Sequence, residues 1–348
     1  MTEKIILSLL INLILLFFCL KYFLQKKILI HKTFGLAHKH NNKKKKLGND
    51  ILLIGGVYIF ISVLLNYFFF YKENIISIII FYLIPIFLVG VFSDIKKDLS
   101  PKLRLIVFFI ASCSFLLSSQ IFISSIDFKI IDLLLKYNIF SIFFFSFCIC
   151  IVINGFNFFD GINGNALVHF LIINTVLAFA IDKFDKDLFY FFISVSLSII
   201  PLLILNFQNK IFLGDNGAYI IGFYISSIIL YLKNSFNLNS YFIAVLLLYP
   251  AFEVLWSIIR KTLENKNVMK PDLYHMHNVL YAYLKIKNHI INHICSTLLI
   301  SSYNLFFIIF AYFNIDDKVI LIKLTSFYVV SYVTIYLLLR LSLSDKNK

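Results

Sequence analysis

Long apolar segments separated by short polar ones run through the whole chain. A helix needs roughly 20 apolar residues to cross the hydrocarbon core of a bilayer. The pattern therefore predicts an all-α integral membrane protein, a single polytopic domain over residues 1–348 with about 11 transmembrane helices. We expect these helices at approximately residues 5–25, 51–71, 75–92, 103–124, 138–154, 165–181, 188–205, 216–232, 240–259, 291–313 and 319–341.

Composition agrees with a membrane protein and excludes several other classes. The chain is 60% hydrophobic and 14% charged, whereas about a quarter of the residues of a soluble domain are charged. With 41 Phe and 20 Tyr against 11 Gly, a disordered or collagen-like chain is excluded. The five cysteines lie inside apolar segments, so they indicate neither a disulfide framework nor a zinc site.

The basic residues divide the loops into two sets. An odd number of spans puts the two termini on opposite sides, and the loops then separate into two sets, of which one holds 21 Lys and Arg against 8 in the other. By the positive-inside rule the richer set faces the cytoplasm. The net charge of +14 thus indicates cytoplasmic loops and contact with membrane lipids, for which Lys43–Lys46 is a candidate anchor, rather than nucleic-acid binding. The basic set comprises residues 26–50, 93–104, 155–164, 206–215, 260–290 and 342–348.

Four polar motifs fall in this same set of loops, although they played no part in the count. They are Ser93-Asp94, Asn154 to Asn163, Gly214-Asp215 and Asp272 to His277. Polar side chains beside a membrane are costly unless they serve a purpose. Their common side predicts a single site at the cytoplasmic surface of the membrane.

The residue types in two motifs suggest phosphate or metal chemistry. In Asn154 to Asn165, amides that can pair with a nucleobase and the Asp160 carboxylate alternate with glycines. The alternative is an ordinary Asn/Gly turn between helices. Asp215 directly precedes a span, where a helix N-terminus favours bound anions, although a simple helix cap explains Gly-Asp-Asn-Gly as well.

The other two motifs leave more alternatives open. Asp94 and Asp98 could position or deprotonate an acceptor, or share a metal with Asp215, beside basic residues that are ordinary membrane anchors. His275 and His277 are nearly opposed if they lie on one helix, so joint action requires irregular backbone. They are candidate donors to a phosphate, or else interfacial histidines.

The order of these motifs resembles that of the polyprenyl-phosphate N-acetylhexosamine-1-phosphate transferases of glycosyltransferase family 4. The resemblance extends roughly over residues 39–280. It rests on Ile54-Gly55-Gly56, Leu99-Ser100-Pro101-Lys102-Leu103-Arg104, the Asn154 to Gly164 segment, Phe212-Leu213-Gly214-Asp215 and His275-Met276-His277.

The resemblance implies a role for each candidate residue. Asn157 and Asp215 would hold Mg²⁺, with Mn²⁺ as the alternative. The catalytic residues would be Asp94, Asp160 and His277. The substrate-binding residues would be Asn154, Asn163, Asn206, His275 and Lys102.

The resemblance also implies the reaction. N-acetylhexosamine-1-phosphate would pass from a UDP-N-acetylhexosamine to undecaprenyl phosphate with release of UMP, at the cytoplasmic face of the bacterial inner membrane. This would initiate an envelope polysaccharide or O-antigen, and a homodimer is left open. Three departures stand out: Ser93 replaces the first residue of an Asp-Asp pair, Leu273 replaces an Arg, and the 26–50 loop lacks a Pro.

Other functions remain as alternatives. A catalytically degenerate family member would keep the fold without the reaction. A transporter or flippase would show ionisable residues at mid-membrane depth and polar loops on both sides, which the pattern does not favour. A phosphatidyl-type transferase or lipid phosphatase would show denser Asp clusters or an Arg/His signature.

Overall fold

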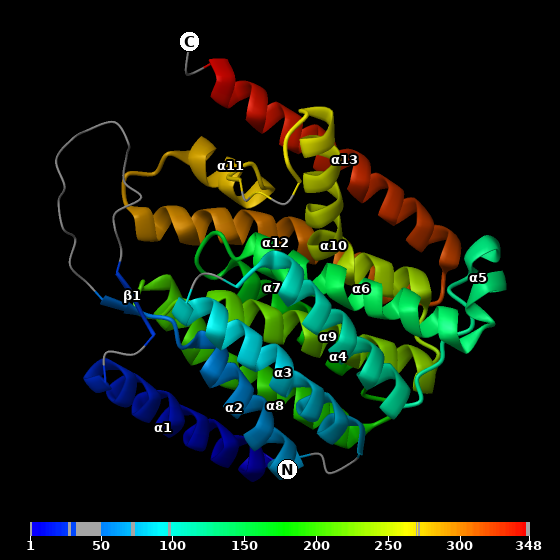
Figure 1. Cartoon of the computed structure of the whole chain (residues 1–348), viewed down its shortest axis with the longest axis horizontal. Coiled ribbons are helices and arrows are strands. Elements are labelled where there is room, and N and C mark those ends of the chain that lie inside the picture. Colours follow the sequence, from blue (N-terminus) through cyan, green and yellow to red (C-terminus); the bar gives the residue numbers. More distant parts are fainter. Residues whose placement is uncertain are drawn as a thin grey trace.

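The computed structural model describes residues 2–26, 29–32, 50–70, 74–96, 99–268, 270 and 272–345 (Figure 1). The Lys43–Lys46 run, with most of the 26–50 loop, and Asp98 lie outside the described residues. The elements are α1 (Thr2–Lys26), β1 (Ile30–Lys32), β2 (Asp50–Leu52), α2 (Gly55–Phe70), α3 (Asn74–Lys96), α4 (Pro101–Ser118), α5 (Lys129–Leu135), α6 (Asn138–Phe159), α7 (Asn165–Ile181), α8 (Lys186–Phe207), α9 (Gly214–Phe236), α10 (Ser240–Leu263), α11 (Met276–Leu284), α12 (His289–Phe313) and α13 (Lys318–Asp345).

The helices confirm the prediction of a polytopic all-α membrane protein. In the described ranges, nine helices are long and apolar enough to cross a membrane, and α2 and α7 are shorter apolar helices of 16 and 17 residues. Together they correspond to the eleven predicted segments. Two further helices, α5 and α11, are short and were not predicted.

A small antiparallel ribbon of β1 and β2 departs from the predicted span at 51–71. Ile30 pairs with Leu52, and Leu52 forms a parallel bridge with Ile211. The Phe212 N–H also donates to the Leu52 carbonyl at 2.8 Å. The span therefore begins with extended backbone, and α2 starts only at Gly55. This pairing ties the N-terminal part of the chain to the loop that leads into α9.

Helix α9 lies at the centre of the bundle and contacts α2, α3, α6 and α7 (Figure 1). It is the most buried candidate span and also the least hydrophobic one. Its polar side chains face neighbouring helices rather than lipid, so they can be satisfied inside the protein. At Gly90 of α3, a Cβ atom would lie 2.4 Å from the Asn216 Cα atom, and this glycine therefore lets α3 approach the first turn of α9.

A buried hydrogen-bond network joins α1, α2 and α8 far from the polar motifs. Asn66 of α2 accepts from the Ser8 hydroxyl at 2.7 Å and from the Ser194 hydroxyl, and its amide donates to the Ser198 hydroxyl at 3.3 Å. Asn66 is fully buried. Because most of the α1 surface is exposed in this structure, these bonds are a main polar link between α1 and the rest of the bundle.

We expect Asn66→Leu, which keeps the number and branching of the side-chain heavy atoms, to destabilise the protein by about 1–2 kcal/mol through the lost interhelical bonds. The thermal unfolding midpoint in one detergent measures the effect. Thr334→Val is the matched control, because the Thr334 hydroxyl is exposed and donates to a carbonyl of its own helix. Equal midpoints for the two variants would contradict the proposed link.

Candidate functional site

Four helix ends meet around Asp215, which lies in the first turn of α9. Ser93 and Asp94 lie in the last turn of α3, Asn157 in the last turn of α6, and Arg104 in the first turn of α4. These residues are far apart in sequence, and tertiary packing alone brings them together. We call this end of the bundle the site end.

The Asp215 carboxylate is the hub of the cluster. Its Oδ2 atom accepts from the Ser93 hydroxyl at 2.7 Å and from Arg104 Nη1 at 2.9 Å, and the Tyr219 hydroxyl lies 3.2 Å away. Its Oδ1 atom accepts from the Asn157 amide at 3.0 Å. The Asp215 side chain is still 36% exposed, so a ligand can reach it from the site end.

Asp94 caps the N-terminus of α9 from the neighbouring helix α3. Its Oδ1 accepts the Asp215 backbone N–H at 2.9 Å and its Oδ2 accepts the Asn216 N–H at 3.3 Å. The first N–H groups of a helix have no partner within the helix and carry a partial positive charge, so a carboxylate there is stabilising. Gly214 has φ +75°, a left-handed conformation that glycine adopts readily, and its missing side chain leaves room for Asp94. Asp94 is thus engaged as a cap.

Arg104, rather than Lys102, enters the cluster. Lys102 is exposed and makes no polar contact with the described residues, whereas Arg104 also reaches the Tyr219 hydroxyl at 2.5 Å. The two side chains are two residues apart near the start of α4, so they point to different sides of the helix. The substrate contact that the family resemblance implies at Lys102 stays a prediction. Residue 103 and residues 105–110 are all apolar, so no helical periodicity in the sequence shows which of the two basic side chains faces the bundle.

The Asn-rich segment divides into a helical part and a turn. Helix α6 continues to Phe159, so Asn157 lies on the helix instead of in the loop predicted at 155–164, and Asn154, the last residue of the predicted span, lies well inside the helix. The Asn154 amide donates to the Cys150 carbonyl of its own helix at 2.7 Å. Asn154 and Asn157 are three residues apart, but Asn157 alone bonds to Asp215.

Asn163 and Asn206 hold the turn together. The Asn163 amide donates to the Asn206 carbonyl at 2.9 Å, and the Asn206 side-chain oxygen accepts the Gly164 N–H at 2.5 Å. The Thr297 hydroxyl donates to the Asn163 carbonyl at 2.8 Å. The structure therefore brings these two predicted substrate-binding residues together, and their amides connect α6, α8 and α12.

Asp160 is half-buried at the C-terminal end of α6, beside the Asp215 cluster. Burial raises the pKa of the Asp160 carboxyl well above its ordinary value, and the nearby Asp215 and Asp94 carboxylates raise it further. This shift favours the protonated carboxyl, which can donate a hydrogen bond or a proton.

His275 and His277 lie beside the turn, stacked on each other. Their ring centroids are 5.7 Å apart with the planes 7° from parallel, since His275 precedes α11 in extended backbone and His277 lies within the helix. On one continuous helix the two side chains would point in nearly opposite directions. Because the backbone changes from extended to helical between them, their rings can stack. A Cβ atom on Gly161 would lie 2.4 Å from His277 Nε2, so the ring packs directly on that glycine. Burial lowers the pKa of His277 to about 3, which leaves a neutral imidazole at neutral pH.

Two residues that the sequence analysis missed support the histidines. Glu253 of α10 is 1% exposed and contacts His275. Arg260, about two turns further along the same face of α10, donates twice to the Asp272 carboxylate, at 2.9 and 3.1 Å. Burial alone would raise the pKa of Asp272, but these bonds hold it below its ordinary value. Glu253 could have been recognised from the sequence, because an acidic residue within a predicted membrane span indicates a functional or paired side chain.

The donors at Asp215 suit a magnesium ion. In the described part of the chain, no group of three or more His, Cys, Asp or Glu residues is arranged to hold a metal ion. Mg²⁺, however, is often bound by one or two carboxylates together with waters and substrate phosphates. Asp215 is a partly exposed carboxylate, and the Asn157 amide would present its oxygen if turned over. These two residues therefore fit a metal that a phosphate ligand helps to hold.

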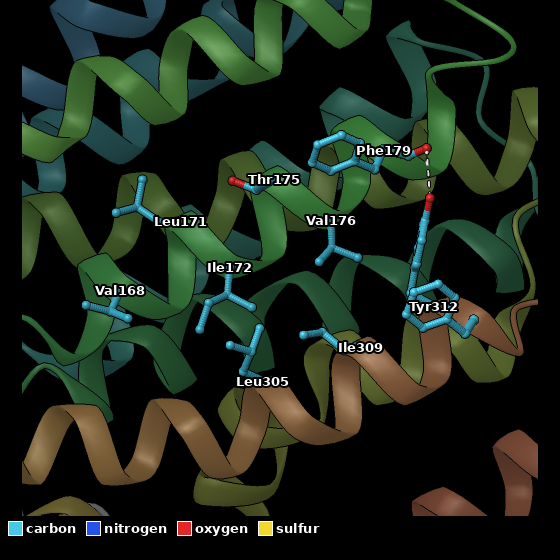
Figure 2. Close-up of a pocket in the computed structure, with 10 residues that line it drawn as sticks. Val168, Leu171, Ile172, Thr175, Val176, Phe179, Leu305, Ile309 and Tyr312 are labelled. Carbon is cyan, nitrogen blue, oxygen red and sulfur yellow. Dashed lines mark hydrogen bonds between the residues drawn. The ribbon is translucent and has the colours of Figure 1, made fainter.

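An apolar groove of about 490 Å³ runs along the bundle between α7 and α12 (Figure 2). The α7 side is formed by Val168, Leu171, Ile172, Thr175, Val176 and Phe179, and the α12 side by Leu305, Ile309, Tyr312 and Phe313. Figure 2 shows Tyr312 bridging the two helices through the Phe179 carbonyl at 3.5 Å. Since α7 begins directly after the Asn163 turn, the groove leads away from the site end.

Comparison with known proteins gives consistent matches. Residues 75–233 match the family described as Glycosyl transferase family 4. "Undecaprenyl-phosphate alpha-N-acetylglucosaminyl 1-phosphate transferase" of Thermotoga maritima is 25% identical over 198 residues, 56% of this chain and 58% of that protein. "Probable undecaprenyl-phosphate N-acetylglucosaminyl 1-phosphate transferase" of Bacillus subtilis is 31% identical over 136 residues, 38% of each chain. The chain thus aligns with less than two thirds of the length of either relative.

We expect Asp94→Ala to lower the free energy of unfolding by about 1–2 kcal/mol, because two N–H groups of α9 lose their acceptor. Asp94→Asn should cost less, since its carbonyl oxygen can still accept one of them. Thermal unfolding of the purified variants in one detergent checks the order. Parental stability in Asp94→Ala would show that the cap contributes nothing.

His277 should make the protein sensitive to acid. Its pKa is about 3 in the folded state against 6.5 as the ordinary value, so its stabilising effect is complete above pH 6.5 and is lost as the pH falls toward 3. Between pH 7 and pH 5 the loss should be about 2 kcal/mol. We expect His277→Gln to flatten the dependence of the unfolding midpoint on pH over this range. Equal slopes in His277→Gln and the parent protein would contradict the burial effect.

Proposed function

We propose that the chain, whose residues 75–233 match glycosyl transferase family 4, transfers N-acetylglucosamine-1-phosphate from UDP-N-acetylglucosamine to undecaprenyl phosphate and releases UMP. The names of the two relatives support this acceptor and this sugar. We further propose that the protein lies in the bacterial inner membrane with the site end facing the cytoplasm, as the basic loops predict.

The observation that carries the proposal is the Asp215 cluster at the ends of four helices. A partly exposed carboxylate, an amide and a capped helix N-terminus lie together there, next to Asp160 and the neutral His277. This position at the membrane boundary allows a water-soluble sugar nucleotide to meet a phosphate carried on a lipid. The groove between α7 and α12 offers an apolar surface for part of the lipid chain.

In the proposed reaction, an oxygen of the lipid phosphate attacks the β-phosphorus of the sugar nucleotide. The bond from that phosphorus to the bridging oxygen breaks, and UMP leaves with the bond's electrons. A phosphate monoester has a second pKa near 6, so the acceptor is largely dianionic at neutral pH and needs little deprotonation. Ser93 in place of an acidic residue is therefore compatible with activity, and so is an Asp94 that serves as a cap.

The residues of the chain would orient and neutralise the reacting phosphates. Asp215 and Asn157 would hold Mg²⁺, which supplies Lewis-acid stabilisation of the charge on the departing UMP. Arg104 adds positive charge beside Asp215, and the neutral His277 can donate one hydrogen bond to a phosphate oxygen. The protonated carboxyl of Asp160 would donate another as charge develops on the leaving oxygen.

Turnover by the purified full-length protein tests the proposal. UMP release should require undecaprenyl phosphate, UDP-N-acetylglucosamine and a divalent metal, and EDTA should stop it. We expect Asp215→Asn to reduce kcat by about 10²–10³, the usual effect of losing one preorganised electrostatic contact. Asp182→Asn is the matched control, because Asp182 forms an exposed ion pair with Lys186 away from the cluster. No UMP release by the parent protein, or undiminished release by Asp215→Asn, would refute the proposed role.

A further inference from the structure

Glu253 is the only acidic side chain among the described residues that is almost completely buried, at 1% exposure. Three donors surround its carboxylate. Oε2 lies 2.9 Å from His275 Nδ1, while Oε1 accepts the Met276 backbone N–H at 3.2 Å and the Tyr332 hydroxyl at 2.9 Å. The carboxylate therefore joins α10, the first turn of α11 and α13 at one point.

We propose that Glu253 is a positioning residue of the site, which fixes the ring orientation and the protonated nitrogen of His275 and thereby the placement of His277. This inference rests on the proposed function, because it assigns Glu253 to that reaction. An ionised carboxylate only accepts hydrogen bonds, so the bond at Oε2 requires a proton on His275 Nδ1. The opposite nitrogen, Nε2, then has no hydrogen-bond partner among the described residues, and the Asp272 Oδ1 atom lies 3.8 Å from it.

The effect reaches His277 through the backbone and the ring stack. Met276, whose N–H binds Glu253, separates the two histidines, and their rings lie nearly parallel at 5.7 Å. His277 in turn packs on Gly161, next to Asp160. A shift of the α11 N-terminus would therefore move the imidazole away from the turn that carries Asp160.

Helix α13 supports the same segment over three successive turns. Tyr332 binds Glu253, Tyr336 donates to the Tyr274 carbonyl at 3.0 Å, and Arg340 pairs with Glu264 at 2.6 Å. Residues spaced by four lie on one face of a helix. This face of α13 thus contacts both α10 and the segment that leads into α11. Among the three contacts, the one to Glu253 is the most deeply buried.

Stability alone is a poor reason for a buried carboxylate. Replacing a buried ion pair by well-packed apolar residues is often neutral or stabilising. Partners that orient a metal-ligating histidine, by contrast, commonly change activity or metal affinity by about 10–100-fold when they are mutated, and we take the same scale for a histidine that faces a substrate. The Glu253→Gln substitution separates these two roles. The side-chain oxygen of the introduced glutamine can still accept hydrogen bonds from Met276 and Tyr332. Its amide nitrogen, however, is a donor, so it can bond to His275 Nδ1 only if that nitrogen has lost its proton.

The experiment uses the full-length protein in one detergent. For each variant it measures kcat, KM, the thermal unfolding midpoint and the ring ¹⁵N chemical shifts of labelled histidines. The signals that disappear in His275→Gln are those of His275. For Glu253→Gln we expect a kcat about 10–100-fold lower, KM for UDP-N-acetylglucosamine within twofold, and a His275 spectrum showing the proton moved from Nδ1 to Nε2. Glu253→Gln with parental kcat and unchanged His275 shifts would overturn the proposal.

Two tyrosines on α13 provide a matched pair. Tyr332→Phe removes the hydrogen bond to Glu253. Tyr328, one turn earlier on α13, donates to Asn304 at 2.7 Å, and Tyr328→Phe removes this similarly buried hydrogen bond. We expect comparable losses of stability, with kcat lowered by Tyr332→Phe alone. An equal loss of kcat in both variants would reduce the role of Glu253 to general packing. If the parent protein releases no UMP, the proposed function fails, while the His275 shifts still decide whether Glu253 controls that ring.

Discussion

Carboxylates that cap helix N-termini from neighbouring helices organise the whole site end of this protein. Asp94 of α3 accepts the first N–H groups of α9, and Glu253 of α10 accepts the first N–H group of α11. Each cap satisfies backbone donors that would otherwise be unpaired at the edge of a membrane bundle. Each also fixes the start of the helix that carries a predicted site residue, Asp215 in one case and His277 in the other.

The central position of α9 explains how one helix can be both a membrane span and the base of a polar site. Its neighbours cover it almost completely, so its polar residues do not face lipid. Asp215 occupies the first turn of α9, which reaches the surface of the bundle at the site end. The partial positive charge of the helix N-terminus then adds to Arg104 beside the carboxylate. The site therefore combines negative ligand atoms with positive charges suited to phosphates.

Ser93 fits the charge balance of the Asp215 cluster. The Ser93 hydroxyl donates to Asp215, where a second carboxylate would repel it. With Asp94 bound to backbone N–H groups and Asp160 favouring the protonated form, Asp215 is the carboxylate most available to a cation. His277 is kept neutral by burial, so it can donate a hydrogen bond without adding charge.

The sequence by itself determined the class of protein, the eleven apolar helices and the four polar motifs, because hydrophobic length and local residue type are properties of short segments. Tertiary structure decided which side chains meet. The choice of Arg104 over Lys102, the use of Asn163 and Asn206 to hold a turn, and the contact of Glu253 with His275 depend on the rotation of each helix about its axis and on its packing against others. That rotation is set by close packing between distant segments, which no local pattern encodes.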